Sequence, residues 1–344
     1  MLKNIVYITH AEKGPSGGAK IIYHHSEIVN KFNKYSSEVV HLKKNRLSKI
    51  KISIKKKLKI NSKNNESGWQ LNQLKAVKKF NYEWFEHNIK TREQLNFDKR
   101  KDFIILPEIF AHLAEDLCIK KGIKYAIFVQ NGYVIASTNN EKKLNLAYNK
   151  ASFVISYSED ITKCIKLKFP KIKTKILKIS YALNLKNNRI KNKKNIITYM
   201  SRKLPTHSYL VTNYLKSQLP KKWLIKDLNN LNEKKTYQSL QESKIFLSFS
   251  NMEGLPLPPA EAALAGNFVV GYTGEGGNEY WKKPIFTKIN SGEIKTFVSE
   301  ILNKIKELNS GKKPPKNQIN GLKKKFSKER EVLNIKKILK FIPK

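Results

Sequence analysis

Short apolar runs alternate with longer amphipathic stretches along the chain. Residues 4–10 (NIVYITH) are mostly apolar, residues 19–32 carry apolar side chains at helical spacing, and residues 36–42 are strand-like again. Strand, helix and strand in this order predict a βαβ unit, from which parallel sheets are built.

The same alternation continues to the C-terminus. Further strands are expected at residues 103–110, 124–135, 151–158, 171–183, 196–203, 244–250, 267–273 and 284–289. Helices are expected from the end of the 103–110 strand to Leu117 and over 159–168, 291–309 and 327–341, and residues 311–318 (GKKPPKNQ) are expected to be a turn and loop.

The pattern predicts an α/β fold of two doubly wound, Rossmann-like domains that face each other across a cleft. Their expected extents are residues 1–183 for the N-terminal domain, 184–195 for an Asn- and Lys-rich linker, 196–326 for the C-terminal domain and 327–344 for a helix that packs back on the first domain. Ligands bind such sheets beyond the carboxyl ends of the strands. Residues 43–65 interrupt the rhythm and are read as a solvated insertion, with a membrane-surface segment as the alternative.

Composition adds a strong charge. The 344 residues include 68 Lys and Arg against 27 Asp and Glu, a formal net charge of +41. Such a surface attracts anionic lipid, nucleic acid or phosphorylated substrates, although coding bias toward Lys, Asn and Ile is an equally good explanation of the charge. No nucleic-acid-binding module is recognisable, and the first strand is not followed by the G-x-G-x-x-G of dinucleotide-binding oxidoreductases, so both classes remain weaker alternatives.

Cysteine content and apolar run lengths bear on location. Cys118 and Cys164 are far apart and lack metal-ligand spacing, which favours a reducing compartment. The first apolar run is too short for a signal peptide, and no run reaches the roughly 18 to 20 residues of a membrane span. A cytoplasmic protein is therefore expected, peripheral on the inner face of the membrane if it contacts one.

Three loops at expected strand ends carry candidate chemistry. The first, residues 10–20, contains Gly17 and Gly18, where backbone amides and a helix N-terminus favour an anion, although Gly-Gly is also an ordinary turn. The second, residues 199–207, contains Arg202 and Lys203, which suit a phosphate.

The third loop is the lysine-free stretch 251–266, NMEGLPLPPAEAALAG. Its prolines suit the start of a helix that Gly266 ends, and this places Glu253 at a strand end and Glu261 in the expected first turn of the helix. A loop that folds back would turn both acids toward one pocket, free of any lysine partner. The simpler alternatives are an exposed acid at 253 and a helix-dipole contact at 261.

This third stretch resembles the E-x7-E signature of retaining GT-B glycosyltransferases, especially glycosyltransferase family 4. The downstream VVGYTGEGGNEYW (269–281) resembles the strand and glycine-rich turn that follow in some of those enzymes, and the two earlier loops lie where that family places its other phosphate-facing loops. The resemblance in order and pattern covers nearly the whole chain, and its specific part is residues 244–281.

The resemblance implies a donor site. By analogy, Glu261 would bind the ribose of a nucleotide-sugar, Glu253 would lie near the transferred sugar, and the amides of Gly254 and Leu255 would face the sugar or diphosphate. Gly17 and Gly18 would also face the donor, and Arg202 and Lys203 would neutralise its diphosphate. The family usually separates the Arg and Lys and has glycine where this chain has Ser201, which leaves open which of the two contacts phosphate.

The resemblance also implies the reaction and its partners. It implies transfer of the sugar with retention, to a cell-surface glycan or lipid-linked acceptor, with an anionic membrane surface as a further partner and no specific nucleic acid. Candidates for contact with the acceptor are Glu108, His112, Gln130 and Asn131, with a structural role as the alternative for His112. No Asp-x-Asp motif is present, so no metal and no cofactor beyond the nucleotide-sugar substrate is expected. An inverting transferase, an epimerase or an inactive homologue remains an alternative on the same fold.

Overall fold

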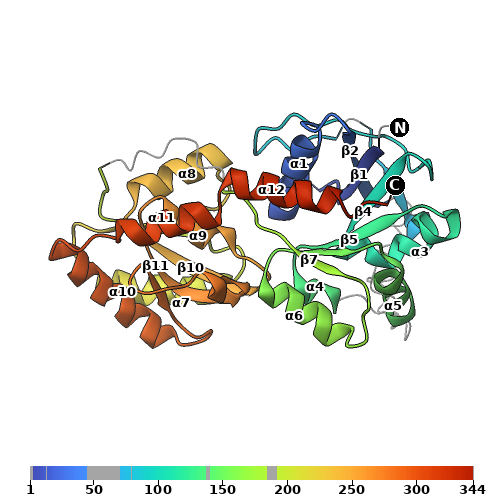
Figure 1. The fold of residues 1–344 in the computed structure, drawn as a ribbon. Coiled ribbons are helices and arrows are strands. Elements are labelled where there is room, and N and C mark those ends of the chain that lie inside the picture. The colour runs from blue at the N-terminus through green and yellow to red at the C-terminus, as the bar shows by residue number, and fades with distance from the viewer. Residues whose placement is uncertain are drawn as a thin grey trace. The chain divides into compact units, whose positions relative to one another are not determined.

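The computed structural model describes residues 3–12, 14–44, 70–78, 80–136, 140–183 and 192–343. The chain divides into two compact units (Figure 1). Unit 1 contains Met1–Ile179 together with Val332–Lys344, and unit 2 contains Ser180–Glu331. The linker expected at 184–195 falls largely outside the described residues, as does most of the insertion expected at 43–65.

Unit 1 is built on a seven-stranded sheet of order β3-β2-β1-β4-β5-β6-β7, parallel except for the edge strand β3. The strands are β1 (Lys3–His10), β2 (Tyr35–Lys44), β3 (Leu74–Ala76), β4 (Asp102–Pro107), β5 (Tyr125–Val129), β6 (Val154–Ser156) and β7 (Ile176–Lys178). The helices are α1 (Gly17–Val29), α3 (Ala114–Leu117), α4 (Gly132–Ile135), α5 (Glu141–Lys150) and α6 (Glu159–Lys168), with short 3-10 helices at Leu71–Gln73, Glu108–Leu113 and Ile119–Lys121.

Strand order changes direction at β1 in this sheet. The crossover from β1 to β2 carries α1 to one face, whereas the crossovers from β4 toward β7 run the other way and carry α5 and α6 to the opposite face (Figure 1). Right-handed crossovers require this arrangement. The central strands are buried on both faces, as the unbroken apolar runs predict.

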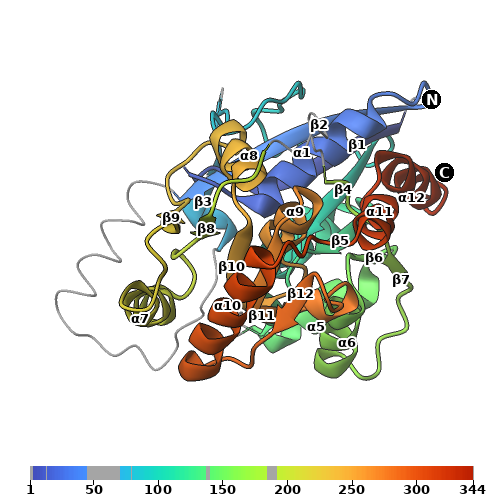
Figure 2. The same ribbon diagram turned by 90° about the vertical axis from the view of Figure 1, so that its left-hand side faces the viewer.

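Unit 2 is built on a fully parallel five-stranded sheet of order β12-β11-β10-β8-β9. The strands are β8 (Ile196–Tyr199), β9 (Leu224–Asp227), β10 (Ile245–Glu253), β11 (Phe268–Glu275) and β12 (Phe286–Lys288). The helices are α7 (Pro205–Lys216), α8 (Glu233–Glu242), α9 (Leu257–Leu264), α10 (Ile294–Asn309) and α11 (Lys316–Lys325), with a 3-10 helix at Gly276–Glu279. Helices α7 and α10 cover one face, and α8 and α9 cover the other (Figures 1 and 2).

The last helix, α12 (Lys328–Leu339), crosses the division between the units. Its final turn belongs with unit 1, where Tyr35 Oη donates to the Leu339 carbonyl and the Phe341 ring packs edge-on to Phe153 at 6.3 Å.

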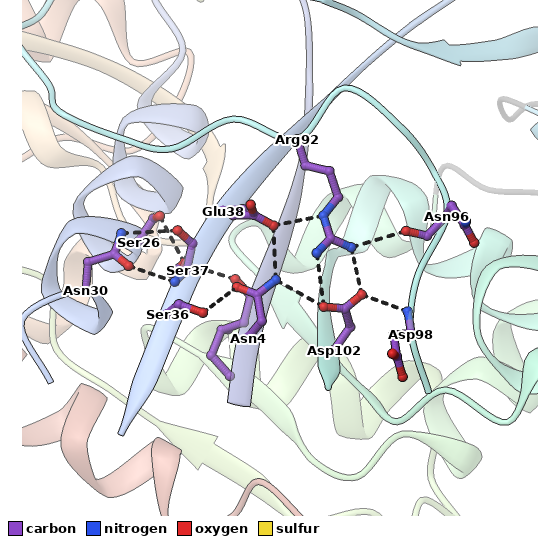
Figure 3. Close-up of polar contacts among 11 residues, drawn as sticks. Asn4, Ser26, Asn30, Ser36, Ser37, Glu38, Arg92, Asn96, Asp98 and Asp102 are labelled. Carbon is purple, nitrogen blue, oxygen red and sulfur yellow. Dashed lines mark hydrogen bonds and ion pairs between the residues drawn. The ribbon is translucent and has the colours of Figure 1, made fainter. Parts of the chain in front are cut away.

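A polar network lies at the amino ends of β1, β2 and β4 (Figure 3). Arg92 binds Asp102 with two nitrogens, at 2.7 and 3.1 Å, and Glu38 with a third at 2.8 Å. The Asn4 amide donates to both carboxylates. A hollow of about 670 Å³ opens beside these side chains. Because the charged groups are already bonded to one another, we interpret the network as the fastening of the segment before β4 to the sheet.

Candidate active site

Glu253 ends β10 at a bulge. The pairing of β10 with β11 slips by one residue between Ser250 and Glu253, and Met252 takes a positive φ of 47°. Bulges at strand ends redirect side chains. Glu253 emerges with its side chain 15% exposed, at the carboxyl edge of the sheet, where ligands bind in folds of this type.

The glycine-rich turn after β11 packs directly on the loop that follows Glu253. A Cβ at Gly276 would lie 1.9 Å from the carbonyl oxygen of Gly254, so no larger residue fits there without moving the loop. Tyr280 Oη donates to the carbonyl of Pro256 in the same loop. The expected strand and turn at 269–281 therefore shape the backbone at Gly254 and Leu255.

Lys203 reaches Glu253 from the loop between β8 and α7. Its Nζ lies 2.9 Å from Glu253 Oε1. The expectation that no lysine partner reaches either acid is therefore wrong for Glu253, because β8 and β10 are adjacent strands and their carboxyl-end loops meet. Arg202 is exposed and forms no ion pair with any residue in the described part of the chain.

Glu261 lies just beyond the first turn of α9, in which it was expected. The helix begins at Leu257, which places Glu261 at its fifth residue and beyond the first turn, so the helix-dipole explanation loses its basis. Burial, and then the charges of Glu253 and Glu261, hold the pKa of Tyr280 well above its usual value. Both carboxylates therefore lie close enough to act on one buried tyrosine.

Sequence reasoning missed the contacts of three further residues, Tyr181, Tyr237 and Ser201. Burial and then the charges of Glu331, Glu261 and Glu233 raise the pKa of Tyr181. Burial is also the main cause of the raised pKa of Tyr237, to which Glu261 contributes. Ser201, which stands in place of the family's glycine, donates to Asp227 at 2.7 Å. These contacts join residues far apart in sequence, and only the loop position of Ser201 could have hinted at one of them.

The candidates in unit 1 form a connected cluster at the carboxyl ends of β1, β4 and β5. The Glu108 carboxylate accepts the backbone N–H groups of Gln130 and Asn131, each at 3.0 Å. Gln130 Nε2 in turn donates to the Gly18 carbonyl at 2.9 Å, and a Cβ at Gly18 would lie 2.3 Å from Gln130 Oε1. Glycine at 18 is thus explained by packing, whereas the space beside Gly17 is open.

Glu108 and His112 are both buried, at 5% and 6% exposure. Burial raises the pKa of Glu108 to about 7, although three backbone N–H groups oppose the rise. A carboxylate held in this way positions its neighbours rather than meeting solvent. Asn131 caps α4 by accepting from the Tyr133 amide, which makes residues 132–135 a helical turn and not the end of the strand expected over 124–135.

Two negative findings apply to the described residues only. They contain no group of three or more His, Cys, Asp and Glu side chains suited to holding a metal ion. None of the helices placed by the structure is both long enough and apolar enough to cross a membrane.

Comparison with solved structures identifies similar proteins, whereas comparison of sequences does not. No protein-family model matches the chain, and no curated protein sequence shows significant similarity to it. Sucrose-phosphate synthase from Thermosynechococcus elongatus is similar in structure with a TM-score of 0.68 at 10% identity, over 98% of both chains. TarM from S. aureus, in a complex with fondaparinux, alpha-GlcNAc-glycerol and UDP, gives 0.66 at 12% identity, over 99% of this chain and 100% of TarM.

A third similar structure covers less of the chain. The pneumococcal O-GlcNAc transferase GtfA, in complex with UDP and GlcNAc, gives a TM-score of 0.51 at 15% identity, over 72% of this chain and 57% of GtfA. At these identities the similarity establishes the fold. The chain has a GT-B-like fold with two Rossmann-like sheets, similar to the structures of sucrose-phosphate synthase and TarM, as the sequence predicted.

Proposed function

We propose that the protein transfers a sugar from a nucleotide-sugar to a glycan or lipid-linked acceptor, with retention of anomeric configuration. The observation that carries this proposal is the grouping at the carboxyl edge of the five-stranded sheet: Lys203 is bound to Glu253, and Tyr280 donates to the carbonyl of Pro256 in the loop that follows Glu253. We interpret this grouping as part of a glycosyltransferase site because the chain has the GT-B fold.

The donor is proposed to lie along this edge. The Glu261 carboxylate would accept from the two ribose hydroxyls, and the amides of Gly254 and Leu255 would face the sugar or diphosphate. Gly17 lies at the first position of α1, where a Cβ would meet nothing within 4 Å, and a helix N-terminus suits an anion. His112, Glu108, Gln130 and Asn131 remain candidates for the acceptor side. Glu108 would act by holding the backbone of Gln130 and Asn131 in place.

Lys203 is proposed to change partner when the donor binds. In the structure Lys203 is paired with Glu253. A diphosphate carries more charge than a single carboxylate and would draw Lys203 away, with Arg202 free to add a bidentate contact. Glu253 would then be released to accept from a hydroxyl of the transferred sugar.

The chemical step needs no protein nucleophile. The bond from the anomeric carbon to the diphosphate oxygen breaks, the acceptor oxygen bonds to the same face of that carbon, and the acceptor proton passes to the departing phosphate. Arg202 and Lys203 would stabilise the negative charge that develops on the leaving group, an effect worth about 3 to 4 kcal/mol per well-placed donor.

The structures with UDP guide the choice of donor. TarM and GtfA were both solved with UDP, and their other ligands are fondaparinux and alpha-GlcNAc-glycerol for TarM and GlcNAc for GtfA. We therefore place UDP-sugars first in a thermal-shift screen that also contains GDP-, ADP- and dTDP-sugars. One nucleotide class is expected to raise the melting temperature, and Glu261→Ala is expected to abolish that rise. If no nucleotide-sugar stabilises the protein, the donor assignment fails.

Glu253→Gln separates binding from transfer. The variant should keep the donor-induced thermal shift, but its rate of transfer should fall by about a hundredfold or more. The reason is that the contact proposed between Glu253 and the transferred sugar stabilises the transition state and not the bound donor. The anomeric proton of the product, read by NMR, distinguishes retention from inversion. Donor binding without any transfer would support the inactive-homologue alternative, and conversion of the donor into another sugar would support an epimerase.

Location and membrane contact belong to the proposal as well. A cytoplasmic protein held to the inner membrane face by its charge would meet lipid-linked acceptors there. Binding to anionic vesicles that weakens as salt is added is the expected behaviour.

A further inference from the structure

Helix α6 has an apolar residue on its solvent-facing side. Ile161 and Ile165 are buried and turn inward, toward β6 and β7. Lys163, Lys166 and Leu167 are spaced i, i+3 and i+4 and therefore share the outer face. The Leu167 side chain is 85% exposed, more than any other large hydrophobic residue that the structure describes.

The sequence on both sides of Leu167 is rich in lysine. Residues 159–178 contain seven lysines and two acids. Some of these lysines are engaged: Lys168 binds Glu141, Lys178 binds Glu159, and Lys175 lies over the Phe341 ring. In the described part of the chain, no ion pair is formed by Lys163, Lys166, Lys171 or Lys173.

We propose that the outer face of α6 and the loop 169–175, together called the α6 surface, dock on an anionic lipid bilayer. The four unpaired lysines would lie among the headgroups, and Leu167 would enter the boundary of the acyl chains. The exposed leucine favours a lipid bilayer over a nucleic acid as the anionic partner. A nucleic acid or another charged polymer would bind the lysines equally well, but a bilayer also offers a continuous apolar phase for Leu167.

The α6 surface gives a location to the membrane contact proposed above, and it rests on that contact but not on glycosyl transfer. Edge strand β7 and helix α6 lie at the end of the seven-stranded sheet. The loops at the carboxyl ends of β1 and β8, which carry Gly17 and Lys203, contribute no residue to it. Binding and transfer can therefore be tested separately.

Sedimentation with vesicles of phosphatidylcholine, with and without phosphatidylglycerol, tests the proposal. Wild-type protein should bind only the anionic vesicles. Leu167→Gln should lower its partition coefficient about tenfold, the factor expected for burying one leucine side chain. Replacing Lys163, Lys166, Lys171 and Lys173 by Gln should lower it on the order of a thousandfold at low salt.

A matched patch in unit 2 provides the control. Leu224 on β9 is 64% exposed and close in sequence to exposed Lys221 and Lys222. The triple substitution of these residues by Gln should leave vesicle binding nearly unchanged. An equal loss in this control would show that charge and apolar exposure anywhere on the surface suffice, and would overturn the assignment to α6.

Two other outcomes would also overturn the proposal. The first is a wild-type protein that ignores anionic vesicles. The second is a Leu167→Gln variant that binds them normally while the lysine variant does not, which would indicate a general polyanion surface, and binding of a single-stranded oligonucleotide with the same lysine dependence would identify it. Leu167→Gln should keep the circular dichroism and the donor-induced thermal shift of wild type, so failure of membrane docking is distinguishable from failure of the proposed transferase function.

Discussion

Gly276 is the most tightly enclosed glycine at the proposed donor site. A methyl group there would meet the Gly254 carbonyl at 1.9 Å and the Glu253 carbonyl at 2.8 Å. Gly276→Ala should therefore displace the loop, lower the free energy of unfolding by about 1–3 kcal/mol and weaken donor binding. Urea unfolding measures the first effect and the donor-induced thermal shift measures the second.

Gly321 provides the opposite case in the same unit. It lies in the exposed interior of α11, without positive φ, and a Cβ there would meet nothing within 4 Å. Gly321→Ala should raise the free energy of unfolding by about 0.5–1 kcal/mol and leave donor binding unchanged. Equal effects at the two positions would contradict the role given to Gly276.

The sequence identified individual donor-site residues better than their contacts. Glu253 and Glu261 stand out because a lysine-rich chain leaves them in a lysine-free stretch, with proline and glycine as local signals. Their relations to Lys203 and Tyr280 depend on the pairing of β8, β10 and β11, and no local pattern encodes that pairing. The assignment of their roles remains a prediction.

Arg92 fastens the segment before β4 to the sheet. Its backbone amide donates to the Val39 carbonyl, and its guanidinium joins Asp102 and Glu38 (Figure 3). Burial opposes ionisation of Asp102, but hydrogen bonds from Arg92, the Asp98 amide and Asn4 hold its pKa below its usual value.

Arg92→Lys should lower the free energy of unfolding by about 1–3 kcal/mol, because an ammonium group cannot bridge both carboxylates and leaves buried Asp102 short of donors. Arg100→Lys, at an exposed position in the same segment, should change it by less than about 0.5 kcal/mol. Urea unfolding of both variants is the measurement. Similar values for the two would show that the network adds little to stability.

Elements with strong local signals were predicted well. Helix α6 spans 159–168 as expected, because Ser158 caps it and Ile161 and Ile165 mark its inner face. The local sequence pattern failed to predict the extent of β7 and the existence of α11. The strand expected over 171–183 forms β7 only at Ile176–Lys178. Helix α11 was not expected, because seven of its ten residues are Lys, Asn or Gly and only two apolar side chains are buried.

Protonation couples the stability of the whole molecule to pH through three buried groups in unit 1. Burial, and then the neighbouring His87 and His10, lower the pKa of His41 to about 4, and burial followed by His24 lowers that of His25 to about 3. Burial raises the pKa of Glu108 to about 7.

The two histidines and Glu108 change the free energy of unfolding in opposite directions as pH falls. Both histidines are neutral in the folded protein but take up protons in the unfolded chain below pH 6.5. Stability is therefore lost as pH falls from 6.5 to about 4 for His41 and to about 3 for His25. Glu108 stays protonated longer in the folded protein, so its contribution is lost as pH rises from 4.5 to about 7. Between pH 4.5 and 6.5 the two histidines outweigh the single carboxyl group, and these three groups together should lower the free energy of unfolding by about 1.4 kcal/mol per pH unit of acidification.

His41→Gln isolates one of these terms. Glutamine offers an oxygen to Tyr23 Oη in place of the histidine Nε2 but does not titrate. The variant should be less stable than wild type at pH 7, and the difference should shrink by about 3 kcal/mol by pH 4, because only wild type pays the cost of keeping His41 neutral. Urea unfolding at several pH values between 7 and 4 measures the difference. A gap that stays constant across this range would show that His41 does not control the acid sensitivity.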